Sequence, residues 1–260
     1  MKLSKILITA VLLIVSFSCK KDNPEPTPEE LERYADVNAA NSLLTVETFL
    51  NEMEYIVRNA PSNQPSISFM NCASVTKQDV TGGQEVTVTF AAGSQCIDNQ
   101  IRSGKLIITY QTGTGNALVT TNEYKIGNLN VKGTYSFQPV TENQQSLLSL
   151  QVQDGEFSVS ENNYIRFSAE RKSNFKVGQT TDSTNDDVFE ITDSSYDLEL
   201  KDATATVNID GESAEAYTVK YSCSQMFRPR GGKLSFSRST GSEKVLLFGN
   251  GDCNSQPSLQ

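Results

Sequence analysis

The stretch LLSLQVQDGEFSVSENNYIRFSAE, residues 147–170, contains the pattern that decides the fold. Apolar and polar residues alternate through LLSLQV, EFSVS and IRFSAE. This period of two is typical of strands that turn one face to a core and the other to solvent. The dipeptide Asp154-Gly155 separates the first two runs and predicts a hairpin turn between them. The stretch therefore predicts consecutive antiparallel strands.

The same alternation extends in both directions, from Pro65 to the C-terminal region. Asp210-Gly211 predicts a second hairpin, between ATATVNI and AYTVKYSC. No long helical pattern interrupts the series, so we expect residues 61–260 to form an all-β, antiparallel domain, built as a β-sandwich or two packed sheets. The further strand-like runs are ISFMNCASV, EVTVTF, KLIITY, ALVTTNEY, VKGTYSF, VFEIT, YDLEL, KLSFS and VLLF.

A helical pattern precedes the strands. TPEE (27–30) has a capping hydroxyl, a proline in the first turn and acids near the positive end of the helix dipole. In NSLLTVETFLNEMEYIVRNA (41–60) apolar residues recur every three or four positions, and Pro61 follows. We expect a helical segment over 29–60. Its apolar face is expected to cover the protein's own sheet; docking on a partner is the alternative.

The N-terminal residues resemble a bacterial lipoprotein signal. A basic start, MKLSK, precedes the apolar run ILITAVLLIV (6–15), which is shorter than the roughly 20 residues that span a bilayer. Small serines then precede Cys19, in the arrangement in which the cysteine thiol is lipidated and becomes the mature N-terminus. We expect 1–18 to be a signal peptide and Cys19 to carry the lipid. An ordinary signal with an incidental cysteine is the alternative.

A proline-rich tether follows the lipidated cysteine. Residues 19–28, CKKDNPEPTP, contain almost nothing apolar and predict an extended, semi-rigid spacer. Two or more acyl chains anchor a protein stably without a transmembrane helix. We therefore expect a soluble domain whose membrane contact is its lipid anchor.

Composition narrows the possible functions. Without Lys2 and Lys5, 20 of the 22 basic residues remain against 31 acidic ones, a net charge of −11. Such a chain repels phosphate backbones, so no nucleic-acid partner is expected. The chain has no histidine, which excludes Ser-His-Asp and Cys-His catalysis and histidine-ligated metal sites. The lack of tryptophan weakens a sugar-stacking platform. We expect no cofactor and favour a non-catalytic protein.

Four further cysteines, in an exported protein, predict two disulfides. A zinc site is the alternative, but no two of them have C-x-x-C spacing. The stretch TFAAGSQCIDNQIRSGKLIITY (89–110) shares its phenylalanine, glycine, cysteine and Gly-Lys-Leu with GGKLSFS and LLFGNGDC near the C-terminus, which suggests two similar halves. Of the three possible pairings we expect Cys72 with Cys96 and Cys223 with Cys253, one in each half.

Two short segments hold weaker candidate sites. In TDSTNDDVFEITD (181–193), Asp182, Asn185, Asp186 and Asp187 could wrap a calcium ion, but they lack the spacing of a dedicated calcium loop. Solvated turn acids are the preferred interpretation. Carboxylates of this segment also point to opposite strand faces, which does not supply the converging pair of a glycosidase.

The second segment is MFRPRGG, in which Arg228 and Arg230 flank Pro229. The two guanidinium groups could clamp a carboxylate or a sulfate. A plain turn, broken by the proline and the following glycines, is the preferred interpretation.

Seven short motifs follow one another along most of 71–253: NCASVT, VTVTFAAGSQC, RSGKLIITY, NLNVKGTYSF, DDVFEITDSS, VKYSC and LLFGNGDC. In this order they resemble a family of Bacteroidota outer-membrane lipoproteins of unassigned activity. The lysines and acids after Cys19 are also similar to the family's signal for export to the cell surface. The resemblance implies an outer-membrane location but no functional residues.

These observations together predict a lipid-anchored protein of the outer membrane, displayed on the cell surface. We expect a non-catalytic binding, adhesive or structural module with an unidentified protein or glycan partner. One alternative is a carbohydrate-binding or carbohydrate-processing accessory, which tyrosines and acids gathered in one concave cleft would favour. A periplasm-facing envelope assembly factor is the second alternative.

Overall fold

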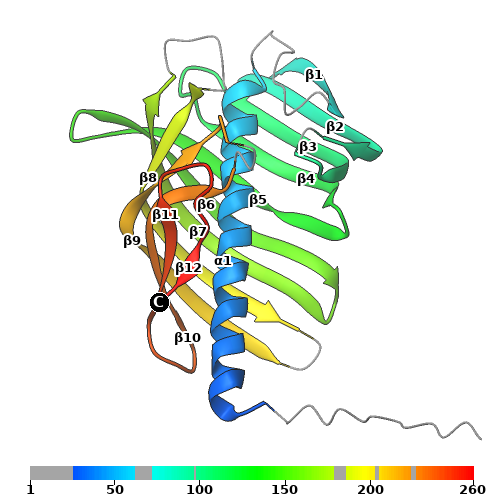
Figure 1. Ribbon diagram of the computed structural model, residues 1–260. Helices are drawn as coiled ribbons and strands as arrows, with labels where there is room; N and C mark the ends of the chain where they lie inside the picture. Colours follow the sequence, from blue (N-terminus) through cyan, green and yellow to red (C-terminus); the bar gives the residue numbers. More distant parts are fainter. Residues whose placement is uncertain (1–25, 62–71, 97, 179–185, 203–204, 224–226) are drawn as a thin grey trace, which may run out of the picture.

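In a computed structural model, one long helix lies against a twelve-stranded antiparallel sheet (Figure 1). The described residues are 26–61, 72–96, 98–178, 186–202, 205–223 and 227–260. The elements are α1 (Pro28–Asn59), β1 (Ala73–Val80), β2 (Gly83–Gln95), β3 (Ile101–Gln111), β4 (Ala117–Ile126), β5 (Leu129–Glu142), β6 (Gln145–Ser160), β7 (Asn163–Val177), β8 (Val188–Lys201), β9 (Thr206–Lys220), β10 (Pro229–Arg238), β11 (Lys244–Asn250) and β12 (Ser258–Leu259).

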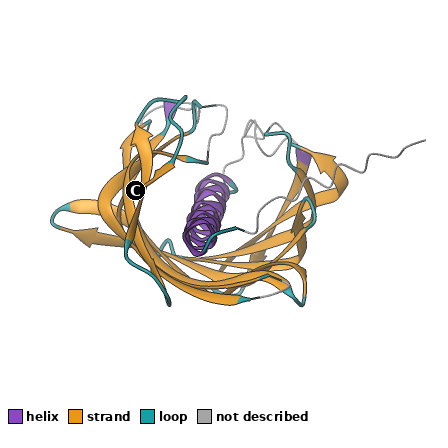
Figure 2. Cartoon of the chain, turned by 60° about the horizontal axis from the view of Figure 1, so that its bottom comes forward, coloured by secondary structure: helices purple, strands orange, loops and turns teal. Residues whose placement is uncertain are grey.

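The sheet is a continuous meander, because its strands are hydrogen bonded in the order in which they occur in the chain. It curves around α1, which runs along the concave side (Figure 2). The core therefore lies between the helix and the inward-facing side chains of the strands. The expected antiparallel β fold with one preceding amphipathic helix is confirmed. The helix packs on the protein's own sheet, also as expected.

The start of α1 is fixed by local chemistry. Thr27 Oγ1 accepts a hydrogen bond from the Glu30 main-chain N–H at 3.2 Å, and a Glu30 carboxylate oxygen accepts one from the Thr27 N–H at 2.7 Å. This reciprocal capping box satisfies two amide groups that the first turn would otherwise leave unpaired. The helix then continues without interruption to Asn59, two residues before Pro61.

Both predicted hairpin turns are wrong. Asp154-Gly155 lies inside β6, and Asp210-Gly211 lies inside β9. A Cβ on Gly155 would lie 2.6 Å from the Phe167 ring, and one on Gly211 would lie 3.1 Å from Leu43 of α1. These glycines therefore allow close approach of a neighbouring side chain, which is the other common reason for a glycine within a strand.

Several strands are longer than expected. LLSLQV and EFSVS are parts of β6, VFEIT and YDLEL are parts of β8, and β9 runs from the end of ATATVNI into AYTVKYSC. A register shift between Val152 and Gly155, with Asp154 at a φ of 52°, marks a bulge in β6. The short strand β12, which pairs with Leu246 and Leu247 of β11, has no alternating signal.

The expected disulfide pairing is confirmed. Cys72 binds Cys96 with Cα atoms 5.0 Å apart, and Cys223 binds Cys253 with Cα atoms 5.2 Å apart. The first bond links the start of β1 to the end of β2, and the second links the segment after β9 to the segment after β11. The relation between the two halves as duplicates stays a prediction.

Residues 1–25, which include the expected signal peptide and Cys19, lie outside the described residues. Within the described part of the chain, no helix combines the length and the apolar character needed to cross a membrane.

Candidate functional site

Three buried arginines from the concave side of the sheet bind acidic residues of α1. They are Arg102 of β3, Arg171 of β7 and Arg238 of β10, and each is less than 10% exposed. Arg238 donates from Nε to Asp36 at 2.7 Å and from Nη2 to Glu32 at 2.5 Å. The interface between the helix and the sheet is therefore partly ionic, in addition to its apolar contacts.

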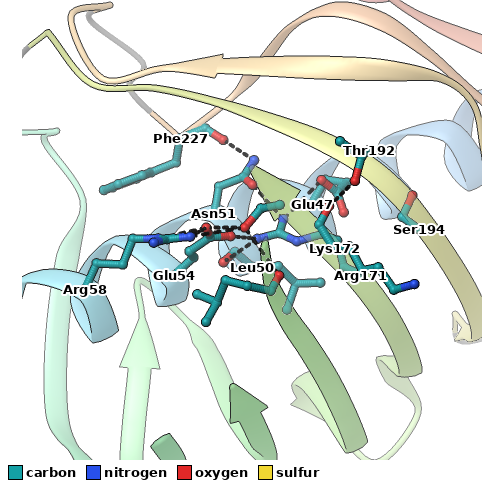
Figure 3. Close-up of polar contacts among 12 residues, drawn as sticks. Glu47, Leu50, Asn51, Glu54, Arg58, Arg171, Lys172, Thr192, Ser194 and Phe227 are labelled. Atoms are coloured by element: carbon teal, nitrogen blue, oxygen red, sulfur yellow. Dashed lines mark hydrogen bonds and ion pairs between the residues drawn. The ribbon is translucent and has the colours of Figure 1, made fainter. Parts of the chain in front are cut away.

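The middle contact centres on Arg171, which points from β7 toward three polar residues of α1 (Figure 3). Its Nη1 donates to Asn51 Oδ1 at 2.6 Å and to Glu47 Oε2 at 3.4 Å. Its Nη2 donates to Glu54 Oε2 at 2.7 Å. Arg58, one turn further along the helix, also binds Glu54, at 2.8 Å. The charges of this cluster neutralise one another within the core.

The electrostatics of this cluster keep Glu54 ionised. Burial favours the neutral carboxyl, but Arg58 and Arg171, with a hydrogen bond from Ser173, outweigh it and hold the pKa of Glu54 below its ordinary value. The buried contact is therefore a true ion pair at neutral pH. Removing one partner would leave an uncompensated buried charge, which is costly.

A chain of hydroxyl groups ends at Glu47. Tyr196 donates to its carboxylate, the Tyr196 and Tyr217 hydroxyl oxygens lie 2.9 Å apart, and the Tyr217 and Ser194 hydroxyl oxygens lie 3.4 Å apart. Burial, reinforced by the negative charge of Glu47, raises the pKa of both tyrosines well above the ordinary value. Because Glu47 is 0% exposed and both phenols stay protonated, these residues act as a structural network and not as an accessible catalytic relay.

The third arginine, Arg102, is enclosed by two carboxylates. It donates to both oxygens of Glu52, at 3.0 and 2.8 Å, and to both oxygens of Asp98, at 2.8 and 2.7 Å. Tyr124 adds a hydrogen bond to Glu52 at 3.0 Å. All three guanidinium nitrogens thus meet a carboxylate. This group of four residues is called the Arg102 cluster below.

A cavity of about 490 Å³ lies beside the Arg102 cluster, between α1 and the strands. Its volume falls within the range of roughly 300–1,000 Å³ that is usual for small-molecule sites, which are mostly apolar with a few fixed polar groups. Thr45 and Thr48 of α1 add hydroxyl groups to its wall. The apolar lining includes Leu44, Phe49, Ile126, Leu129, Phe157 and Phe227.

The two arginines of the MFRPRGG segment have different surroundings. Arg228 lines the cavity and is half-buried. Arg230 is 1% exposed, and its Nη1 donates to the main-chain carbonyls of Cys253 at 2.7 Å and Ser255 at 3.5 Å. Burial lowers the pKa of Arg228 from its ordinary value, because it penalises the charged guanidinium. Of the two, Arg228 is the one that lines the cavity.

Only part of the calcium candidate lies within the described residues. Asp182 and Asn185 lie outside the described residues, whereas Asp186 and Asp187 lie just before β8. Among the described residues, no three or more acidic, cysteine or histidine side chains are grouped in a way that could hold a metal ion. Neither the weak calcium candidate nor the preferred interpretation as solvated turn acids is tested by the described residues. Burial, with the neighbouring charge of Asp186, raises the pKa of Asp187 to about 6.

Sequence reasoning missed the buried polar side chains of α1. Glu47, Asn51 and Glu54 recur at four and three positions, so they share one helix face beside the apolar stripe. That repeat is a signal that could have marked the face as buried. Their partner Arg171 lies 117 or more residues away in the chain, and no local pattern indicates the pairing.

Comparisons of the chain with family models, with curated proteins and with solved structures find no match. A function must therefore be argued from the site and not from a shared fold. The cavity beside α1 is a candidate ligand site, with Arg228, Arg102, Glu52 and Asp98 in its wall.

Proposed function

We propose that this protein is a non-catalytic binding module of the cell envelope that holds a small, largely apolar ligand between α1 and the sheet. The observation that carries the proposal is the cavity of about 490 Å³, with its mostly apolar lining. Apolar walls exclude water from a bound ligand, and the few fixed polar groups orient it.

The state of the ionisable groups supports binding without catalysis. A general base must be able to exchange a proton with its substrate. At the cavity, Glu52 already accepts hydrogen bonds from Arg102 and Tyr124. Deeper in the core, Glu47 is bonded to Arg171 and Tyr196. These acids are engaged in contacts that hold α1 on the sheet.

The same arrangement argues against the carbohydrate alternative. Seven of the nine tyrosines are buried, and Tyr124 and Tyr196 direct their hydroxyl groups to acids of α1 within the core. Tyrosines and acids that satisfy one another in the interior do not form an open platform for a sugar ring. This distribution favours the binding module.

We also propose that the module is lipid-anchored through Cys19 at the outer membrane, displayed on the cell surface and related to the Bacteroidota lipoproteins that its motifs resemble. The tether leads to Thr27, the N-cap of α1. The anchor would therefore be connected to the domain through α1, which lies along the concave side of the sheet. The two sides of the curved sheet face each other across α1 (Figure 2), which supports a description as a sandwich with a helix between its layers.

Binding of an uncharged fluorescent probe tests the proposed function. Cys19→Ser protein, which needs no detergent because it cannot carry the expected lipid, would be titrated with N-phenyl-1-naphthylamine. A saturable, blue-shifted increase in fluorescence at a stoichiometry near one is expected. The absence of saturable binding would refute the proposed function.

A matched pair of variants places the probe in the cavity. Thr45 lines the cavity and is exposed, so Thr45→Trp should fill part of the space without disturbing the core. It should weaken probe binding at least tenfold. The same substitution at the exposed Thr141 of β5, outside the cavity lining, should leave binding unchanged. Equal effects of the two variants would place the probe elsewhere.

A further inference from the structure

The first turns of α1 extend beyond the sheet and expose apolar side chains (Figure 1). Residues 28–34 are all exposed, and the first buried residue of the helix is Asp36. Leu31 is 54% exposed, Tyr34 61% and Val37 38%. Because these three residues recur every three positions, their side chains lie on one side of the helix. This group of three is called the tip patch below.

The tip patch ends where the open side of α1 becomes polar. Asn38, Asn41 and Thr45 follow Tyr34 at helical spacing on the same side, and all three are exposed. A helix that lies flat on a membrane needs an apolar face along its length. The change from apolar to polar side chains therefore restricts a contact with an apolar phase to the first turns of α1.

Most acids near the tip patch already have partners within the protein. The stretch 29–36 contains four acidic residues, of which Glu30 belongs to the capping box. Arg238 of β10 binds Glu32 at 2.5 Å and Asp36 at 2.7 Å. Charge attraction therefore does not indicate a charged partner for this end of the helix. What the tip patch offers is apolar surface, which gains free energy by leaving water.

The length of the tether indicates which apolar phase the tip patch meets. Eight residue steps separate Cys19 from Thr27, the N-cap of α1. An extended chain spans at most about 3.6 Å per residue, so the start of α1 cannot lie more than about 30 Å from a lipidated Cys19. A tether this short raises the effective concentration of the tip patch at the lipid surface, so that even a weak contact is populated. The amphipathic ring of Tyr34 suits the interface between lipid and water.

We infer that the tip patch docks on the bilayer that holds the lipid anchor, as a second membrane contact in addition to the acyl chains. The inference rests on the proposed anchoring through Cys19, to which it adds an orientation of the domain. The N-terminal turns of α1 contact the lipid, and the sheet extends away from it. The helix residues that line the cavity begin at Leu44, about 20 Å along α1 from Leu31, so the cavity is held clear of the bilayer.

A tryptophan reporter tests the inference, because the chain has no tryptophan of its own. Tyr34→Trp protein would be purified with its lipid and reconstituted into vesicles of phosphatidylcholine with brominated acyl chains, which quench only a nearby indole. Compared with unbrominated vesicles, the fluorescence should fall by about half, and the quenching should persist at high salt because the contact is apolar. The matched reporter Leu118→Trp, at a 43% exposed position of β4, should not be quenched.

A second substitution assigns the contact to the tip patch. Leu31→Gln in the Tyr34→Trp protein leaves the tether and the reporter unchanged, and glutamine is a good helix former. Quenching should fall at least twofold, because an apolar contact is lost. Leu118→Gln in the same reporter protein is the matched control and should leave quenching unchanged. Circular dichroism would check that both variants keep their fold.

The outcomes separate the inference from the proposed anchor. If the reporter protein floats with the vesicles but is not quenched, is quenched no more than Leu118→Trp, or is insensitive to Leu31→Gln, the docking inference is wrong and the anchor stands. If the protein does not float with the vesicles, the proposed anchor is wrong, and the inference fails with it. A blue shift of Tyr34→Trp fluorescence that grows with protein concentration in the Cys19→Ser protein would instead assign the tip patch to a second copy of the chain and overturn the inference.

Discussion

The guanidinium of Arg102 on β3 and the carboxylate of Glu52 on α1 form a two-pronged ion pair, with Nε–Oε1 at 3.0 Å and Nη2–Oε2 at 2.8 Å. The two side chains are 1% and 6% exposed, although the residues are 50 positions apart in the chain. A buried charge that loses its partner keeps its desolvation cost. The pair therefore fixes the position of α1 against the sheet.

Breaking this ion pair should be strongly destabilising. Arg102→Met alone is expected to lower the free energy of unfolding by about 3–5 kcal/mol, because it leaves the buried carboxylate of Glu52 without its cation. Glu52→Gln should cost less, since Asp98 still pairs with Arg102. Urea denaturation followed by circular dichroism would measure the loss. Arg166→Met is the matched control, since Arg166 is 55% exposed in its contact with Glu156 and should cost about 1 kcal/mol or less.

The double variant tests whether the two residues act as a pair. Glu52→Gln combined with Arg102→Met removes both charges, so the total loss should be smaller than the sum of the two single losses by at least 1 kcal/mol. Asp98 and Tyr124 remain at the site, so full recovery is not expected. Additive losses would show that the contact does not couple α1 to β3.

Asp187 should make the protein more stable as the pH falls toward 4. Its pKa in the folded protein is raised to about 6 from an ordinary value of 3.8 by burial and by Asp186, with Arg58 acting in the opposite direction. The folded state therefore binds a proton more tightly than the unfolded state between these values. Above pH 6 the buried charge is a penalty, and the penalty disappears as the pH falls through this window.

The substitution Asp187→Asn imitates the protonated form and isolates this effect. It should raise the free energy of unfolding by about 1–3 kcal/mol at pH 7.5, with the gain shrinking toward zero near pH 4. Urea denaturation of both proteins at a series of pH values measures the difference. Asp197→Asn, at an exposed position of β8, should show no such trend. A gain that does not depend on pH would contradict the titration of Asp187.

The disulfide between Cys223 and Cys253 should hold the C-terminal edge of the sheet. Its partners are 30 positions apart, and β12 contributes only Ser258–Leu259. Replacing both cysteines with serine should cost about 2–5 kcal/mol, chiefly by releasing the unfolded chain from its constraint. Amide hydrogen exchange should show the largest loss of protection in β11 and β12.

Peptide mapping tests the pairing of both disulfides directly. A digest without reducing agent should give one linked pair of peptides that contains Cys72 and Cys96 and another that contains Cys223 and Cys253. A peptide that joins Cys72 to Cys223 or to Cys253 would contradict the structure and the two-halves hypothesis together.

Cys19→Ser should release the protein from the membrane fraction. The expected acyl chains stabilise membrane attachment by about 0.8 kcal/mol for each buried methylene, and the described residues offer no helix that could replace them. Fractionation of cells, followed by a carbonate wash, measures the distribution. If the variant stays in the membrane fraction after the wash, Cys19 is not the anchor. Protease added to intact cells would then test surface display of the unaltered protein.

The sequence by itself determined the elements whose causes are local. The capping box of Thr27 and Glu30 spans three positions, and the helix stripe and the strand alternation repeat over two to four positions. These interactions form whenever the segment adopts its regular structure, so a linear pattern records them. The disulfide pairing could be predicted because the shared motif placed one pair of cysteines in each half of the strand region.

Only the tertiary structure decided which side chains pack on the concave side of the sheet. Gly155 and Gly211 indicated turns in the sequence, yet they serve close contacts with Phe167 and with Leu43 of α1. The arginines of β3, β7 and β10 bind α1 across 50 to 206 positions of the chain, and Arg228 reaches the same cavity as Arg102. Strand register and the curvature of the sheet determine which of these side chains come into contact. Both depend on the sum of many long-range contacts, which no short stretch of sequence records.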